Sequence, residues 1–296
     1  MVLYFFNAYP TKIVNISNFV AMDRVVLYIH GMGGGSDSRI PSILRDVFLH
    51  PAKQLPSVEG TALGYNPLRG STFASPSVEG NSHSESQCSP DSQCPPESLC
   101  HPERSEGSSK AVTARVEIVA RTYDFDPEVA AKQIAAWVEE LKPDLVIGES
   151  LGSMQAIRIT GVPHLFVSPS LNAPFVFGQL AWMALIPGVT WLLDRIYKPR
   201  EGDRQPLHFT FKTLRKYRQH RREALKNTTL NGSKDYFFAF FGTRDHYRRY
   251  GIVTIRSWEK YYGKTYQIYE GTHFMEEEHI NALLVPKICE ILNVSL

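Results

Sequence analysis

The chain has 296 residues, of which 43% are apolar and 21% are charged. These fractions match those of globular proteins and exclude a fibrous chain or one that is disordered throughout. The 32 basic and 30 acidic residues leave a net charge of +2. Bulk charge therefore does not favour nucleic acid, and we expect no nucleic-acid partner.

Residues 1–22 form an N-terminal extension of doubtful order. Its start is apolar, but it has no basic opening region and no small-residue cleavage site, so we do not predict a secretory signal. Met22 directly precedes the first clear strand. Two hypotheses stay open: translation starts at Met22 and the extension is extraneous, or it starts at Met1 and the extension forms an edge hairpin.

The first part of the predicted core is residues 23–53, with an apolar strand over 25–29 and an amphipathic helix over 38–49. Residues 54–112 then lose all periodicity and are rich in Ser, Pro and Glu, which predicts a disordered insertion. A six-residue unit repeats there and holds Cys88, Cys94 and Cys100. Five residues separate these thiols, a spacing that zinc sites do not favour, and unpaired cysteines indicate a reducing, cytoplasmic location.

Strands and helices alternate again in residues 113–171, which predicts a parallel sheet. We expect strands over 116–120, 145–147 and 164–167, and helices over 127–141 and 154–159. Residues 172–233 are too long for a crossover and predict a helical cap. Residues 234–296 complete the core, with strands over 236–241 and 265–269 and a last helix over 276–292.

The central motif is Gly148-Glu149-Ser150-Leu151-Gly152, which follows an apolar strand and precedes a helix. A serine at such a strand-to-helix elbow has strained backbone geometry that exposes its hydroxyl. The glycines avoid collisions with the neighbouring strand and helix. This context makes Ser150 the candidate nucleophile, against the alternative of an inert serine in a glycine-rich turn.

A serine hydroxyl needs a base, and the base needs an acid that orients it. Asp245 follows the strand at 236–241, and His273 follows the strand at 265–269. Loops at the carboxyl ends of parallel strands share one edge of the sheet, so these side chains are expected to converge on Ser150. The nearest competitors for the acid are Asp235 and Asp194. His246 and His279 are less suitable bases by position.

Donors for the oxyanion are expected from the loop after the first strand, His30-Gly-Met-Gly-Gly-Gly35. The predicted pair is the N–H groups of Met32 and Leu151, with His30, Gly31, Gly33, Gly148 and Gly152 supporting the loop and the elbow. A nucleotide-binding loop is the alternative. The glycines do not match G-x-G-x-x-G, and no Walker lysine follows them.

The chain resembles the α/β-hydrolase superfamily, in particular small bacterial esterase-like serine hydrolases. The resemblance is carried by four motifs in this order: the glycine turn after His30, GESLG at 148–152, G-x-x-D at 242–245 and G-x-H at 271–273. The resemblance covers residues 23–293 apart from the insertion and the cap. It implies an α/β fold with a mostly parallel, doubly wound sheet and a helical cap between nucleophile and acid. Two departures are the long insertion and the lack of clear early antiparallel strands.

The cap begins with nineteen uncharged residues, 175–193, which Pro187-Gly188 interrupts. A membrane crossing there would separate Ser150 from Asp245, so we expect two short apolar helices over the site instead. Residues 195–226 hold eleven basic and three acidic residues. They predict a solvated helix face or, alternatively, weak contact with an anionic membrane surface.

These residues predict a serine hydrolase acting on a small-molecule carboxylic ester with an apolar acyl part, through an acyl-enzyme and with no cofactor or metal. A thioesterase or acyltransferase would use the same triad, and a non-catalytic ligand-binding module on this fold is the alternative from another class. The sequence does not predict the oligomeric state.

Overall fold

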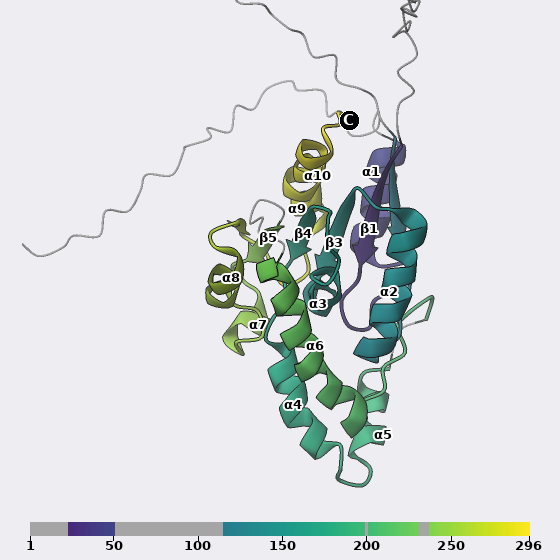
Figure 1. Ribbon diagram of the computed structural model, residues 1–296, viewed down its shortest axis with the longest axis vertical. Coiled ribbons are helices and arrows are strands. Elements are labelled where there is room, and N and C mark those ends of the chain that lie inside the picture. Colours follow the sequence, from purple (N-terminus) through teal and green to yellow (C-terminus); the bar gives the residue numbers. More distant parts are fainter. Residues whose placement is uncertain (1–22, 51–114, 199–200, 231–236) are drawn as a thin grey trace, which may run out of the picture. The chain divides into compact units, whose positions relative to one another are not determined.

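The computed structural model describes residues 23–50, 115–198, 201–230 and 237–296. Figure 1 shows the arrangement of their helices and strands. The extension at 1–22, with its hairpin hypothesis, lies outside the described residues. So do the insertion at 54–112 with its three cysteines, and residues 231–233 of the expected cap.

Six strands form one sheet in the order β2-β1-β3-β4-β5-β6, and every neighbouring pair is parallel. The strands are β1 (Arg24–Ile29), β2 (Val116–Ala120), β3 (Leu145–Glu149), β4 (His164–Val167), β5 (Phe237–Gly242) and β6 (Tyr266–Tyr269). The predicted mostly parallel sheet is confirmed, and no antiparallel strand precedes β1 within the described residues.

Both faces of the sheet are covered, because successive side chains of each strand point to opposite sides. Val26 and Tyr28 lie in one apolar cluster, and Leu27 and Ile29 lie in another. The first cluster includes side chains from α1 (Arg39–Leu49) and α10 (Val285–Leu292). The second includes side chains from α2 (Pro127–Leu141), α3 (Ser153–Ala156) and α8 (Ile255–Tyr262). The sheet is therefore doubly wound, as predicted.

Local sequence sets the limits of α2. Pro127 occupies the start of the helix, where a missing N–H costs no hydrogen bond, and the Asp126 side chain accepts a hydrogen bond from the Glu128 N–H. The helix ends at Lys142, which adopts a left-handed conformation with φ of 45°. The predicted span of 127–141 is therefore confirmed.

The last predicted helix, over 276–292, is interrupted in the structure. It comprises α9 (Glu277–His279), a π-helical turn η4 (Ile280–Leu284) and then α10. Pro286 has no N–H to donate to the preceding turn, which accounts for the change in winding just before α10. The expected helix over 154–159 is likewise shorter, since α3 ends at Ala156.

Three helices lie between β4 and β5: α4 (Ala173–Met183), α5 (Val189–Ile196) and α6 (Phe211–Leu230). Gly188, at φ of 85°, separates α4 from α5 at the predicted break in the apolar run. We call these helices with their connections the helical segment. No helix among the described residues is long and apolar enough to span a membrane.

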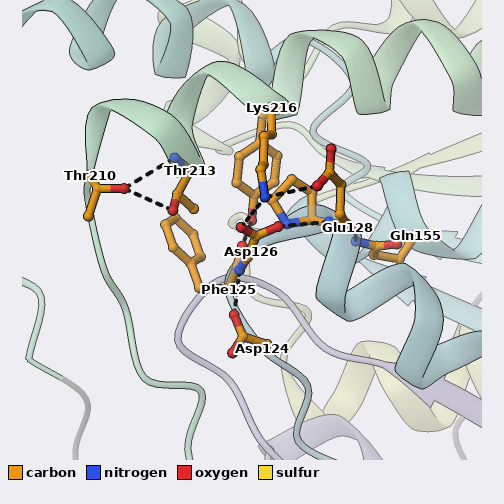
Figure 2. A network of polar contacts seen from close by, with 10 residues as sticks. Asp124, Phe125, Asp126, Glu128, Gln155, Thr210, Thr213 and Lys216 are labelled. Carbon is orange, nitrogen blue, oxygen red and sulfur yellow. Dashed lines mark hydrogen bonds and ion pairs between the residues drawn. The ribbon is translucent and has the colours of Figure 1, made fainter.

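The helical segment is tied to the start of α2 through α6. Lys216 forms ion pairs with Asp126 at 2.6 Å and Glu128 at 2.9 Å (Figure 2). At the next position, the buried Tyr217 hydroxyl donates to the Phe125 carbonyl at 2.6 Å. A third apolar cluster lies beneath α4 and α6 and includes Leu151, so the helical segment packs directly beside the elbow.

Candidate active site

Ser150 lies in a strained turn at the end of β3. Its φ is 48°, a left-handed conformation that is uncommon for a residue with a side chain. The chain passes from β3 into a short 3-10 turn, η2 (Ser150–Gly152), and then into α3. This is the geometry of a nucleophile elbow, in which the turn places the serine hydroxyl at the carboxyl edge of the sheet, accessible to a substrate.

The glycines on either side of Ser150 are required by close packing. A Cβ at Gly148 would lie 2.8 Å from the Ala156 Cβ, and one at Gly152 would overlap the backbone carbonyls of Ile29 and His30. Carbon atoms do not approach so closely without displacement of the neighbour. The motif therefore lets α3 turn back against β1 and β3.

The three side chains that the sequence selected lie in hydrogen-bond contact with one another. The His273 Nε2 atom is 2.9 Å from the Ser150 Oγ atom, and its Nδ1 atom is 2.8 Å from the Asp245 Oδ2 atom. His273 and Asp245 are 1% and 4% exposed. Since a carboxylate only accepts, Nδ1–H donates to Asp245 and leaves Nε2 free to accept from the serine hydroxyl.

Backbone hydrogen bonds join the loops that carry Asp245 and His273. The Thr243 N–H donates to the Tyr269 carbonyl at 2.9 Å, and the Arg244 N–H donates to the Gly271 carbonyl at 2.8 Å. Asp245 also begins α7 (His246–Arg249), and its Oδ1 atom accepts from the Tyr247 N–H at 2.8 Å. The carboxylate is thus held by one bond on each oxygen.

The imidazole of His273 is further confined by aromatic rings. The Tyr247 ring meets it edge to face with 4.5 Å between centroids, and the Phe274 ring does so at 5.2 Å. Packing of this kind restricts rotation about the side-chain bonds. Together with the bond to Asp245, it aims Nε2 at Ser150.

Ser170 is a residue that the sequence analysis did not select. It is 3% exposed, its Oγ atom lies 3.1 Å from the Ser150 Oγ atom, and its N–H donates to the Ser150 carbonyl at 3.0 Å. It follows β4, the neighbour of β3, at the same edge of the sheet. The sequence could have indicated Ser170, because it follows a predicted strand just as Ser150, Asp245 and His273 do.

The loop after β1 lies against Ser150. A Cβ at Gly31 would be 3.1 Å from the Ser150 Cβ atom, and Gly33 adopts a φ of 71°. Met32 packs on the apolar cluster beneath the helical segment. The backbone beside Met32 therefore lies close to the elbow that carries Leu151, and the assignment of their N–H groups to the oxyanion stays a prediction.

His30 supports this loop. It is fully buried, its Nδ1 atom is 2.7 Å from the Gly31 carbonyl oxygen, and its ring stacks on Tyr123 with centroids 4.2 Å apart. Burial lowers its pKa to about 4, so the ring is neutral at physiological pH. The Tyr123 hydroxyl donates to the His30 carbonyl, which holds the backbone next to Gly152.

The other candidate acids and bases lie elsewhere. Asp194 accepts from the Phe209 N–H, and Asp235 is outside the described residues. The His279 ring packs against Tyr269, and the exposed His246 ring is 6.2 Å from the His273 ring. No group of three or more His, Cys, Asp or Glu side chains in the described part of the chain is arranged to hold a metal ion.

Comparison with known proteins finds no match by sequence and a distant similarity among solved structures. No protein-family model matches the sequence, and no curated protein matches it. Among solved structures, the chain is similar to "Structure of MenH from S. aureus", with 12% identity and a TM-score of 0.39 over 93% of this chain and 95% of that one. At this distance the similarity indicates nothing about substrate.

The class of fold follows from the chain's own geometry. It is a parallel, doubly wound sheet with a serine elbow after its third strand and the acid and histidine after its last two. This is the α/β-hydrolase type of fold that the sequence resemblance implied.

Proposed function

We propose that this protein is a serine hydrolase that cleaves carboxylic esters through an acyl-enzyme. The observation that carries the proposal is the unbroken chain of contacts from Ser150 through His273 to Asp245, with distances of 2.9 and 2.8 Å. An inert serine in a glycine-rich turn would need neither the strained φ nor a buried histidine and carboxylate behind it. A non-catalytic binding module would not need this alignment either.

In the proposed first step, the Ser150 oxygen attacks the ester carbonyl carbon while His273 Nε2 takes the hydroxyl proton. The imidazolium that forms is stabilised by the ionised Asp245. The carbon–oxygen bond to the alcohol then breaks, and His273 returns the proton to the leaving alkoxide. A water molecule, deprotonated by the same nitrogen, attacks the acyl carbon. The bond from this carbon to the Ser150 oxygen then breaks, His273 returns the proton to that oxygen, and the carboxylic acid leaves. These steps need no cofactor.

The negative charge on the carbonyl oxygen needs donors that are in place before the reaction. We assign this role to the N–H groups of Met32 and Leu151. Support comes from the contact between Gly31 and Ser150, which brings the first loop beside the elbow. Preorganised amides of this kind contribute about 100- to 1000-fold each to turnover in related chemistry.

An apolar acyl part is the proposed substrate preference. Leu151 and Met32, the two residues whose amides we assign to the oxyanion, belong to the same apolar cluster as Phe177 of α4. A substrate carbonyl held by these amides would therefore extend its acyl chain along apolar side chains. Thioesters present the same carbonyl and a comparable chain, so the choice between them requires measurement.

A fluorophosphonate probe tests the nucleophile directly, because it labels an activated serine covalently. The parent should be labelled and Ser150→Ala should not. Ser42→Ala serves as the matched control, since the Ser42 hydroxyl lies on α1 and donates to the Ser38 carbonyl, away from the site. Absence of labelling in folded parent protein would contradict the proposal and favour a binding module.

A panel of p-nitrophenyl esters and the corresponding acyl thioesters, from acetyl to dodecanoyl, then tests the substrate. We expect kcat/KM on the esters to rise with chain length before it levels off, with turnover abolished in Ser150→Ala. Labelling by the probe together with turnover of thioesters alone would place the protein among thioesterases. It would overturn the ester assignment but not the nucleophile.

A further inference from the structure

Helices α4 and α5 and the turn between them carry large apolar side chains that the fold leaves exposed. Trp182 is 63% exposed, Trp191 is 66% exposed and Ile196 is 63% exposed. Four more large apolar side chains of this turn and its flanking helices are exposed: Met183, Leu185, Ile186 and Leu192. We call these seven residues the apolar tip; Figure 1 shows the turn at the end of the helical segment away from the sheet. Large apolar side chains that are left exposed within one short stretch of chain are typical of an interaction site.

A basic band adjoins the apolar tip on α6. Lys212, Arg215, Arg218 and Arg222 are exposed, and none of them forms an ion pair with a carboxylate in the part of the chain that the structure describes. The nearby acids are already engaged. Asp194 accepts from the Phe209 N–H, and Glu223 pairs with Arg158 at 3.3 Å. The basic band is therefore free to attract an anionic partner.

The basic band and the apolar tip form one continuous surface. The Arg215 guanidinium lies over the Trp182 ring at 5.9 Å and over the Phe211 ring at 5.2 Å. Arg195 lies over Trp191 at 5.7 Å. Between α4 and α6 the band borders a groove of about 530 Å³, whose walls include Phe175, Arg215, Arg218 and Arg222. Positive charge and exposed aromatic rings are thus paired along the surface.

We propose that this surface docks the protein onto an anionic phospholipid bilayer. The apolar tip would enter the boundary between headgroups and acyl chains, where tryptophan is favoured, while the basic band contacts phosphate and other anionic headgroup oxygens. The proposal needs only the exposed surface and does not depend on the hydrolase chemistry. Its failure is therefore distinguishable from failure of the proposed function.

The charge distribution argues against two other occupants. A two-fold symmetric dimer through this surface would bring two basic bands into one interface in which neither the apolar tip nor the basic band offers an acidic side chain to pair with them, which is unfavourable. Nucleic acid would neutralise the basic band but leave the tryptophans and aliphatic side chains of the tip in water. A bilayer with anionic lipid satisfies both parts at once.

Vesicle co-sedimentation of the full chain tests the proposal. We expect binding to vesicles of 70% phosphatidylcholine and 30% phosphatidylglycerol, weakening as salt is raised, and little binding to phosphatidylcholine alone. Arg215→Gln/Arg218→Gln/Arg222→Gln should weaken the partition constant at least about tenfold, since each charge near such a surface contributes measurably. Trp182→Ala/Trp191→Ala should weaken it by a similar factor through lost apolar burial.

Matched variants control for charge and hydrophobicity in general. Lys132→Gln/Arg256→Gln/Lys264→Gln removes three exposed charges elsewhere, and Leu49→Ala/Ile268→Ala removes two exposed apolar side chains elsewhere. Both should bind within about twofold of the parent, and thermal unfolding checks that every variant is folded. Absence of binding to anionic vesicles, or equal loss in the controls, overturns the proposal. Self-association abolished by the tryptophan variant, without vesicle binding, would make the surface a dimer interface.

Discussion

The carboxyl edge of the sheet and the apolar tip differ in how the fold treats their side chains. At the edge, Asp245 and His273 are almost fully buried, and each polar atom that the proposed reaction uses has a partner. At the tip, Trp182 and Trp191 are about two-thirds exposed. Buried, paired groups are preorganised for chemistry, whereas exposed apolar groups retain their capacity to bind. Under the two proposals, the carboxyl edge carries out the reaction and the tip attaches the protein to a membrane, so the two tasks would lie on separate parts of one chain.

After the loss of turnover in Ser150→Ala, the largest expected effect at the edge comes from replacing the acid. Asp245→Asn should lower ester turnover about 10⁴-fold, because the amide can still accept the Tyr247 N–H but can present its NH₂ to His273 and favour the wrong tautomer. Steady-state kinetics with a soluble ester measure this. Asp126→Asn is the control, since Asp126 begins α2 as Asp245 begins α7 and does not contact His273. Turnover of Asp245→Asn within tenfold of the parent would contradict the assignment.

The next effect concerns backbone packing at the elbow. Gly152→Ala should destabilise the fold by about 3 kcal/mol or more, because the new Cβ would overlap two carbonyl groups of β1 and its following loop. Gly161→Ala is the control: nothing lies within 4 Å of its added Cβ, so only its φ of 82° opposes the change, at about 1 kcal/mol. In urea unfolding, Gly152→Ala should therefore lose more free energy of unfolding than Gly161→Ala. Equal losses in the two variants would refute the packing argument.

Buried histidines should make stability depend on pH. Burial lowers the pKa of His30, His164 and His220 to about 4, against 6.5 for an exposed histidine. Below pH 6.5 the unfolded chain therefore binds protons that the folded chain does not, so stability is full above pH 6.5 and declines toward pH 4. At pH 5 each histidine contributes a loss of about 2 kcal/mol relative to pH 8.

Urea unfolding of His164→Gln at pH 8 and pH 5 tests this dependence. Between pH 8 and pH 5, the free energy of unfolding should fall by about 2 kcal/mol less in the variant than in the parent, whatever the stability of the variant at pH 8. Ile134→Val, a buried change without a titrating group, controls for destabilisation and should keep the parental dependence on pH. The same dependence in His164→Gln as in the parent would refute the prediction.

The smallest expected effect is at Ser170, which we interpret as a positioning residue. Ser170→Ala should lower kcat several-fold, to about tenfold at most, with KM nearly unchanged, because one neutral hydrogen bond to Ser150 is lost. Ser168→Ala, a buried serine on the same loop, is the control. An equal loss of kcat in Ser170→Ala and Ser168→Ala would indicate that Ser170 contributes only to packing.

Local patterns were sufficient to predict most of the elements. The apolar run before Gly148 predicted β3, and Asp126-Pro127 predicted the start of α2, because burial periodicity and capping depend on near neighbours. The last helix was predicted as continuous and is not, because the prediction gave no weight to Pro286, which removes one N–H donor from the preceding turn. The helical segment was predicted as helical, but its contact with α2 through Lys216 was not.

By itself, the sequence determined the alternation of strands and helices and the elbow motif, and it nominated Ser150, Asp245 and His273. These follow from spacing and residue type, which are local properties of the chain. Only the tertiary structure decided the order of the strands, the meeting of the three side chains, the contact of Ser170 with Ser150 and the exposure of the apolar tip. Such features depend on which distant segments pack together, and the tryptophans of the tip would have the same local pattern whether buried or exposed.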